Sequence, residues 1–343
     1  MRRFFYLLPL LLIIISCGGN DNNKTKEVQW SLTQLGADFE IRAIACGDNE
    51  TVITVGSDGR IARSENSGNS WTTAYRISDI GYALNGITYC SNMFMIAGDK
   101  HTILYSANEG KSWLIALPSF TEIDYKSVTC NGSVFLLAGE TTLSIGNEKF
   151  DNRTALSVNS GASWESHKVS GVIPDNSAYI AVKLLMFGGG TYYLATDGGF
   201  AGYSSDGKVW NKLPTPVNAD YNFTGMAQGT DNGTKLTLFC ATTTGDNATG
   251  KVVAAYNDNI TEWSNAMPHV TEPVRGVAFG KDAFMVLTDN SAYFSDNFTD
   301  GNITWTEGSR PQIINQKITT VNYCGNAFWV GTDRGQIWRA FYH

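Results

Sequence analysis

One eight-residue stretch occurs three times in this chain with almost no change. It reads Ser-Glu-Asn-Ser-Gly-Asn-Ser-Trp at residues 64–71, and near-copies stand at residues 106–113 and 157–164. Each copy follows short apolar, β-branched or aromatic runs, and the whole unit repeats roughly every 40 to 50 residues. A period of this length with four strand-like segments per copy is typical of a β-propeller. The sequence therefore predicts an all-β fold in which each copy forms one blade.

Aligning the copies in register indicates seven units. The centres of their predicted first strands lie near Ile44, Ile87, Val128, Leu185, Met226, Val277 and Val321. The seventh unit, residues 320–343, ends after its third strand and lacks the turn and the closing tryptophan strand. Residues 27–33, around Trp30, look like an orphan fourth strand. We therefore expect a seven-bladed β-propeller whose N-terminal strand completes the last blade and covers its open edge.

The repeated stretch has the composition of a tight turn. Ser and Asn side chains bond nearby backbone amides, Gly supplies a positive φ, and Trp covers the hairpin with an apolar plate. Later copies decay: residues 204–210 are one residue shorter, residues 256–263 carry Ile260 in the Gly place, and residues 295–305 contain an insertion. This decay indicates that the turn is kept for shape and not for chemistry.

The first residues predict export. Arg2 and Arg3 precede an apolar run at residues 4–15, which is shorter than the about 20 residues that span a bilayer. The run is typical of a cleaved signal segment. The sequence Ile-Ile-Ser-Cys at residues 14–17 resembles the bacterial lipoprotein processing box, which implies cleavage after residue 16 and lipid on Cys17. The alternative is an ordinary secretory signal with an incidental Cys17.

These observations divide the chain into a signal peptide (1–16), a polar, Asn-rich, flexible tether (17–27) and a propeller (28–343). We expect the protein to be lipid-anchored in the cell envelope, on the periplasmic face or at the cell surface. The chain has 25 basic and 32 acidic side chains, a formal net charge of −7, which does not favour a nucleic-acid partner. The four histidines lack ligand spacing, and phosphate-loop and nucleophile-turn motifs are absent, so the sequence predicts no metal and no cofactor.

Five cysteines remain besides Cys17, so at least one must be unpaired. Four of them, Cys46, Cys90, Cys130 and Cys324, recur near the end of the first strand in different units. Because a disulfide needs Cα atoms closer than about 7 Å, this recurrence favours buried packing residues over bridges.

The phrase at residues 55–64 together with the Trp71 turn resembles the Asp-box, or BNR-repeat, propellers, and it is most similar to their photosystem II stability/assembly factor-like branch. The resemblance covers most of residues 28–343. It implies that the repeated turns lie away from the binding face, which is then formed by loops between second and third strands and between blades. Sialidases and xyloglucanase-type glycosidases share this turn. Sialidase-like members carry an Arg-Ile-Pro element in the first blade, where this chain has Arg42-Ala43-Ile44.

The loops after the second strands carry an acidic residue in nearly every unit. These residues are Asp58, Asp99, Glu140, Asp197, Asp289 and Asp333, with Asp246 as a looser seventh. Around one mouth they would form a ring able to bind a cation, a basic partner or sugar hydroxyls. The alternative is that they only form turns. The loops between blades add Arg42, Arg275, Tyr125 and Tyr221 to the predicted face.

The function predicted from these patterns is a lipid-anchored, monomeric envelope propeller that binds or scaffolds a protein or glycan through one loop face. The alternative is a glycoside hydrolase, which needs two carboxylates roughly 5 to 9 Å apart. The ring offers many candidate pairs and no preferred one, so no catalytic residue is assigned.

Overall fold

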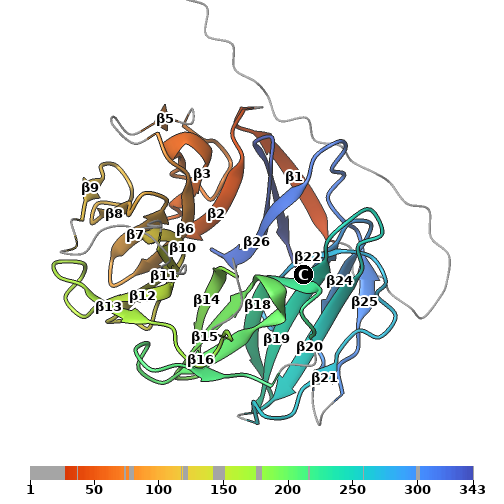
Figure 1. Ribbon diagram of the computed structural model, residues 1–343. Coiled ribbons are helices and arrows are strands. Elements are labelled where there is room, and N and C mark those ends of the chain that lie inside the picture. Colours follow the sequence, from red (N-terminus) through yellow and green to blue (C-terminus); the bar gives the residue numbers. More distant parts are fainter. Residues whose placement is uncertain are drawn as a thin grey trace, which may run out of the picture.

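The computed structural model describes residues 28–36, 38–72, 75–76, 81–116, 118, 123–141, 151–174, 180–214, 217–257, 259–298 and 302–342. The predicted signal peptide, Cys17 and the tether lie outside these residues. The described chain forms seven four-stranded antiparallel sheets around a common axis (Figure 1). This arrangement confirms the predicted seven-bladed all-β fold. Among the residues described, no helix is both long enough and apolar enough to cross a membrane.

Each blade has four strands, ordered from the axis outward. The first strands are β2 (Ile41–Cys46), β6 (Leu84–Cys90), β10 (Ile123–Cys130), β14 (Val182–Gly188), β18 (Tyr221–Asp231), β22 (Val274–Gly280) and β26 (Ile318–Cys324). The second strands are β3 (Val52–Gly56), β7 (Met93–Gly98), β11 (Phe135–Thr141), β15 (Thr191–Thr196), β19 (Thr234–Thr243), β23 (Ala283–Thr288) and β27 (Ala327–Thr332). The third strands are β4 (Arg60–Ser64), β8 (Ile103–Ser106), β12 (Asn152–Ser157), β16 (Ala201–Ser204), β20 (Gly250–Tyr256), β24 (Ala292–Ser295) and β28 (Gln336–Phe341).

The outermost strands are mostly short. They are β5 (Tyr75–Arg76), β9 (Leu114–Ile115), β13 (Glu165–Lys168), β17 (Asn211–Lys212), β21 (Ser264–Asn265), β25 (Thr306–Gly308) and β1 (Gln29–Gln34). Two 3₁₀ turns, η1 (Ser57–Gly59) and η2 (Asp197–Gly199), follow second strands. We number the blades one to seven in chain order, beginning with β2–β5 and ending with β26, β27, β28 and β1.

The hydrophobic core lies between the blades. The second strands are apolar and β-branched or aromatic, and every residue of β3 and β23 is buried because each sheet packs on both faces. Neighbouring first strands contact one another all the way around the axis, including β26 with β2. A buried cluster therefore spans each junction, such as Phe39 and Ile41 of blade one with Trp329 and Ile337 of blade seven.

The N-terminal strand closes the ring as the sequence predicts. Strand β1 pairs antiparallel with β28 in blade seven, with Trp30 opposite Ala340. The Trp30 Nε1 group also donates to the Ser309 carbonyl at 2.9 Å, and Val28 is buried. The edge of β28 is thereby covered.

The sequence-based interpretation of the cysteines as packing residues is wrong. Disulfides join Cys46 to Cys324 and Cys90 to Cys130, with Cα–Cα distances of 5.6 and 6.3 Å. Equivalent positions in neighbouring blades come close because the first strands stand side by side around the axis. Recurrence at one place in the repeat therefore favours bridging in this fold. Cys240 is free and buried, and burial raises the pKa of its thiol.

The repeated stretch folds as the predicted turn, which we call the tryptophan turn. In blade one the Ser64 hydroxyl oxygen accepts the Gly68 N–H at 2.8 Å, and the Asn66 Oδ1 accepts the Ser70 N–H at 2.8 Å. The Trp71 Nε1 group donates back to the Gly68 carbonyl at 3.2 Å. Because Ser64, Asn66 and Trp71 bond groups within the turn, these residues of the motif are explained by the shape of the turn.

The tryptophan turns of blades one to four also pack against the preceding blade. A Cβ on Gly68 would lie 2.4 Å from the Trp329 ring of blade seven, and Arg339 of that blade donates to the Ser67 carbonyl. The same contact recurs between equivalent positions at Gly110 and Ile53, Gly161 and Met95, and Gly207 and Leu136. The turn glycine is thus a junction residue between blades.

Candidate functional site

One end of the axis gathers the loops between second and third strands and the loops between blades, because the strands alternate in direction. We call this end the loop face, and the opposite end, which carries the tryptophan turns, the turn face. A repeated backbone hydrogen bond ties the two kinds of loop together. The pairs run from the N–H of Asp99 to the carbonyl of Ala83, Asp197 to Ala181, Asp289 to Pro273 and Asp333 to Lys317, at 2.9 to 3.2 Å.

Each first strand has a β-bulge near its start, at the loop face. The pairing register shifts by one residue there in all seven blades, which leaves one residue of the first strand unpaired. The bulged residues are Arg42, Asn85, Lys126, Lys183, Thr224, Arg275 and Thr319. A bulge re-aims the side chain that it carries. Four of these seven positions hold a basic side chain.

The bulged bases neutralise most of the predicted acidic ring. The Arg275 guanidinium donates two hydrogen bonds, of 2.6 and 2.7 Å, to the Asp289 carboxylate. The Lys183 ammonium lies 3.2 Å from the Asp197 carboxylate. The face is therefore a ring of ion pairs, with bases on first strands and acids at the ends of second strands. Sequence analysis named the acids and Arg42 and Arg275 but missed Lys126 and Lys183.

In blades one to three these contacts form a continuous polar chain. Arg42 bonds the Glu40 carboxylate at 3.1 Å and the Asn85 amide oxygen at 2.6 Å. The Asn85 amide nitrogen donates to Asp99 at 2.8 Å. The chain continues through the Lys126 ammonium, which lies 2.9 Å from Asp99 and 3.6 Å from Glu140. Since its members come from three blades, this chain orients charged groups across two junctions.

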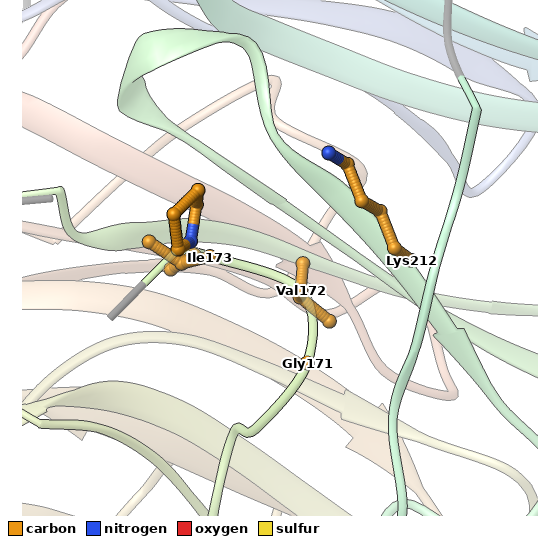
Figure 2. Close-up of a pocket in the computed structure, with 5 residues that line it drawn as sticks. Gly171, Val172, Ile173 and Lys212 are labelled. Carbon is orange, nitrogen blue, oxygen red and sulfur yellow. The ribbon is translucent and has the colours of Figure 1, made fainter. Parts of the chain in front are cut away.

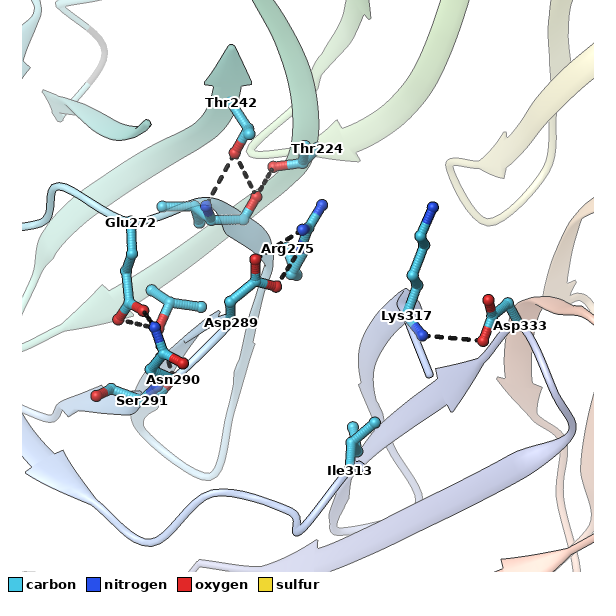
Figure 3. A network of polar contacts seen from close by, with 12 residues as sticks. Thr224, Thr242, Glu272, Arg275, Asp289, Asn290, Ser291, Ile313, Lys317 and Asp333 are labelled. Carbon is cyan, nitrogen blue, oxygen red and sulfur yellow. Dashed lines mark hydrogen bonds and ion pairs between the residues drawn. The ribbon is translucent and has the colours of Figure 1, made fainter. Parts of the chain in front are cut away.

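Blades five to seven carry a second polar network at the loop face (Figure 3). In blade five the bulged Thr224 and the neighbouring Thr242 both donate to the Val274 carbonyl of blade six at 2.8 Å. The hydroxyl of Thr319, the bulged residue of blade seven, donates in the same way to the Ile41 carbonyl of blade one. These two bulged residues therefore bond blade five to blade six and blade seven to blade one.

Blades six and seven expose charged side chains beside these contacts. Figure 3 shows the Lys317 side chain projecting away from the Asp333 carboxylate, which accepts the Lys317 backbone N–H at 2.9 Å. Glu272 accepts hydrogen bonds from the Thr288 hydroxyl and the Asn290 amide. The arrangement offers both donors and acceptors to a partner at this face.

Three other predicted site residues have different surroundings. Asp58 adopts a left-handed conformation (φ 56°) in η1, as expected for a turn residue, and its carboxylate lies 3.7 Å from Arg76. Tyr221 is half-buried, with its hydroxyl 3.5 Å from that of Thr249. The prediction that Tyr125 is a contact residue is wrong, because its side chain is fully buried. Burial also raises the pKa of its phenol.

The buried position of Tyr125 follows from the bulge. Tyr125 precedes the bulged Lys126 and pairs with Gly139, as Leu84 pairs with Gly98 in blade two. This place in the strand points into the core. Among the described residues the Tyr125 hydroxyl has no hydrogen-bond partner.

Two shallow depressions lie at the outer strands of blades four and five. The first, of about 210 Å³, is lined by the loop at residues 171–174 and by Lys212 of β17 (Figure 2). The second, of about 520 Å³, lies between Pro214 and the turn at residues 256–263. Among the described residues neither depression is lined by two carboxylates, which is the acid pair that the hydrolase alternative requires. Within the described part of the chain, no group of three or more His, Cys, Asp or Glu residues is placed to hold a metal ion.

No protein-family model matches this sequence, and no curated protein matches it. Solved structures share its fold. YCF48 bound to D1 peptide superposes with a TM-score of 0.68 at 15% identity, over 93% of this chain and 100% of that chain. Virginiamycin B lyase from Staphylococcus aureus gives 0.68 at 14% identity, over 91% and 99% of the two chains. An ancestral GH74 enzyme gives 0.66 at 15% identity, over 89% of this chain and 45% of that chain. At these identities the likeness shows the fold alone.

Proposed function

We propose that this protein is a lipid-anchored envelope propeller that binds a polypeptide segment of another envelope protein through its loop face. Lipid on Cys17 holds the propeller at a membrane, and residues 18–27 give it reach. The observation that carries the proposal is the ring of ion pairs on the bulged first strands. It places donors and acceptors from several blades around one mouth.

The ring suits recognition better than hydrolysis. Asp99, Glu140, Asp197 and Asp289 each have a basic partner within 2.6 to 3.6 Å, so these carboxylates are held by the protein's own bases. The same groups remain partly exposed, with 30% of the Arg275 side chain and 38% of Asp289 accessible. A polypeptide can exchange hydrogen bonds with both charges of such pairs.

A protein of the same fold has a peptide partner, since YCF48 has been solved bound to D1 peptide. Enzymes also occur among the similar structures. The fold is thus compatible with either activity, and the ion-paired ring is what favours binding here. No feature of the two depressions favours the hydrolase.

Site-specific photo-crosslinking in cells tests the proposal. A photoreactive amino acid replaces Asp58 or Lys317, two exposed loop-face residues whose side chains lie outside the paired ring. Matched controls carry it at Val158 and Val209, which are 68% and 67% exposed in tryptophan turns. We expect the two loop-face positions to capture the same polypeptide and the two turn-face positions to capture none of it.

Charge variants then test the ring itself. Arg275→Asp places two acids side by side and should reduce capture from position 317 about tenfold, because it breaks a partly buried ion pair at the mouth. The double variant Arg275→Asp, Asp289→Arg keeps an ion pair but exchanges the positions of its two charges. It therefore distinguishes an effect on partner binding from an effect on folding. Equal capture from both faces, or unchanged capture with Arg275→Asp, would contradict the proposed face.

A further inference from the structure

The tryptophan turn of blade five departs from the others at the positions that make the regular turn. Trp263 Nε1 donates to the Ile260 carbonyl at 2.7 Å, as Trp71 donates to Gly68, so the two turns align residue by residue. In this alignment Tyr256 replaces Ser64, Ile260 replaces Gly68 and Glu262 replaces Ser70. The turn keeps its tryptophan and loses the serines and the glycine.

These replacements remove structural contacts. In the turns of blades one to four the first serine is at most 2% exposed and accepts the glycine N–H. Tyr256 is only half-buried, and Ile260 occupies the place where glycine lets the turn press onto the preceding blade. Ile260 and Trp263 pack on the cluster that contains Tyr193 of blade four and Phe239 of blade five. The altered turn therefore contacts blade four through the bulkier Ile260 side chain in place of a glycine.

The depression of about 520 Å³ lies at this altered turn. Pro214, after the outermost strand of blade four, forms one side, and Tyr256, Asn259, Glu262 and Trp263 are among the residues on the other. The volume falls within the range of small-molecule sites, about 300 to 1,000 Å³. Tyr256 and Glu262, which stand at the positions of Ser64 and Ser70, thus both line this depression.

The lining offers free polar groups beside aromatic surface. Among the described residues the Tyr256 hydroxyl has no hydrogen-bond partner, and burial raises its pKa, so it remains a neutral donor. Glu262 uses one carboxylate oxygen to accept the Asn259 amide at 3.0 Å and keeps the other open to solvent. The rings of Tyr256 and Trp263 are partly exposed.

We propose that this depression is a second binding site, for a neutral hexopyranose unit of a glycan. A sugar ring presents an apolar face, which packs on aromatic side chains, and hydroxyls, which bond to a carboxylate, an amide and a phenol. The described residues of the lining include the Glu262 carboxylate and no basic side chain, which disfavours acidic sugars. The site lies at a tryptophan turn and is therefore separate from the loop face.

Ligand-observed saturation-transfer NMR and calorimetric titration of the full-length protein test this site. The ligands are the methyl glycosides of glucose, galactose, mannose and N-acetylglucosamine and their disaccharides. We expect saturable binding of at least one of them. Tyr256→Phe removes a hydrogen-bond donor, and Glu262→Gln replaces a charged acceptor with a neutral amide oxygen, so each variant should weaken binding about tenfold.

Two controls keep the outcomes distinct. Tyr256→Phe removes a single oxygen atom. Its melting temperature, measured beside that of the wild-type protein, tests whether the variant folds. Arg275→Asp with Asp289→Arg alters the loop face and should leave sugar binding unchanged, which separates this site from the proposed polypeptide site. The absence of saturable binding across the panel, or binding indifferent to both Tyr256→Phe and Glu262→Gln, would overturn the proposal.

Discussion

The glycine of the tryptophan turn connects the repeated motif to the assembly of the ring. Gly68 has a φ of 80° and sits where a Cβ would come within 2.4 Å of the Trp329 ring. Two independent constraints therefore act on one position: a left-handed backbone and the face of the neighbouring blade. Gly190, in the hairpin between β14 and β15, has a similar φ of 84° but nothing within 4 Å of a Cβ.

This pair of glycines separates backbone strain from packing. We expect Gly190→Ala to lower the free energy of unfolding by about 1 to 2 kcal/mol, the cost of a left-handed non-glycine residue. Gly68→Ala should cost about 1 to 3 kcal/mol more, because the added methyl group must displace Trp329. Denaturant unfolding followed by tryptophan fluorescence measures both. Equal losses would show that the turn does not press on blade seven.

Single residues of the loop face were only partly predictable. The acids stand out in the sequence because they follow apolar second strands. Their partners Lys126 and Lys183 do not, since a bulge is a shift in pairing register that leaves no composition signal in a single chain. The same shift buries Tyr125, which the sequence placed in an exposed loop before a strand that in fact begins at Ile123. The predicted carboxylate ring was therefore half of the arrangement.

Among elements, the outermost strand of blade seven differs from its counterparts. Six of the outermost strands have two to four residues, whereas β1 has six and pairs along its whole length with β28. The last repeat lacks a fourth strand, and the chain begins with an unassigned one. The pairing of these two segments, over 300 residues apart, could therefore be predicted from the sequence.

Removing β1 should expose the β28 edge. We expect a chain that starts at residue 36 to lose about 3 kcal/mol or more of stability, because Val28 and the ladder to β28 are lost. It should also associate in a concentration-dependent way through the open edge. A chain that starts at residue 28 keeps β1 and serves as the control. Light scattering after gel filtration and thermal unfolding measure both effects, and identical behaviour of the two chains would show that β1 does not protect the edge.

At the scale of the whole molecule, the ring is closed at one junction by several connections. Between blades seven and one lie β1, the Cys46–Cys324 disulfide and the hydrogen bond from Asn322 to the Ile44 carbonyl at 2.7 Å. Sequence analysis predicted the strand and favoured packing over bridging for the cysteines, which is wrong for Cys46 and Cys324. It treated the cysteines as separated by their blades, while circular symmetry brings equivalent ends of neighbouring first strands together. The ring of blades was predicted, but the short distance between cysteines at equivalent positions of neighbouring blades was not.

The two disulfides differ in the length of chain that they enclose. Cys46 and Cys324 are 278 residues apart and join the first and last blades, whereas Cys90 and Cys130 are 40 apart and join blades two and three. By loop-closure entropy the long loop contributes about 6 kcal/mol and the short loop about 4 kcal/mol. Cys46→Ser with Cys324→Ser should therefore destabilise the propeller by about 2 kcal/mol more than Cys90→Ser with Cys130→Ser. Denaturant unfolding of both double variants under oxidising conditions measures the difference, with the reduced wild-type chain as the reference. If the two variants lose the same stability, β1 and the apolar contacts hold the ring closed, and the bridge between the first and last blades adds no more than one between any two neighbours.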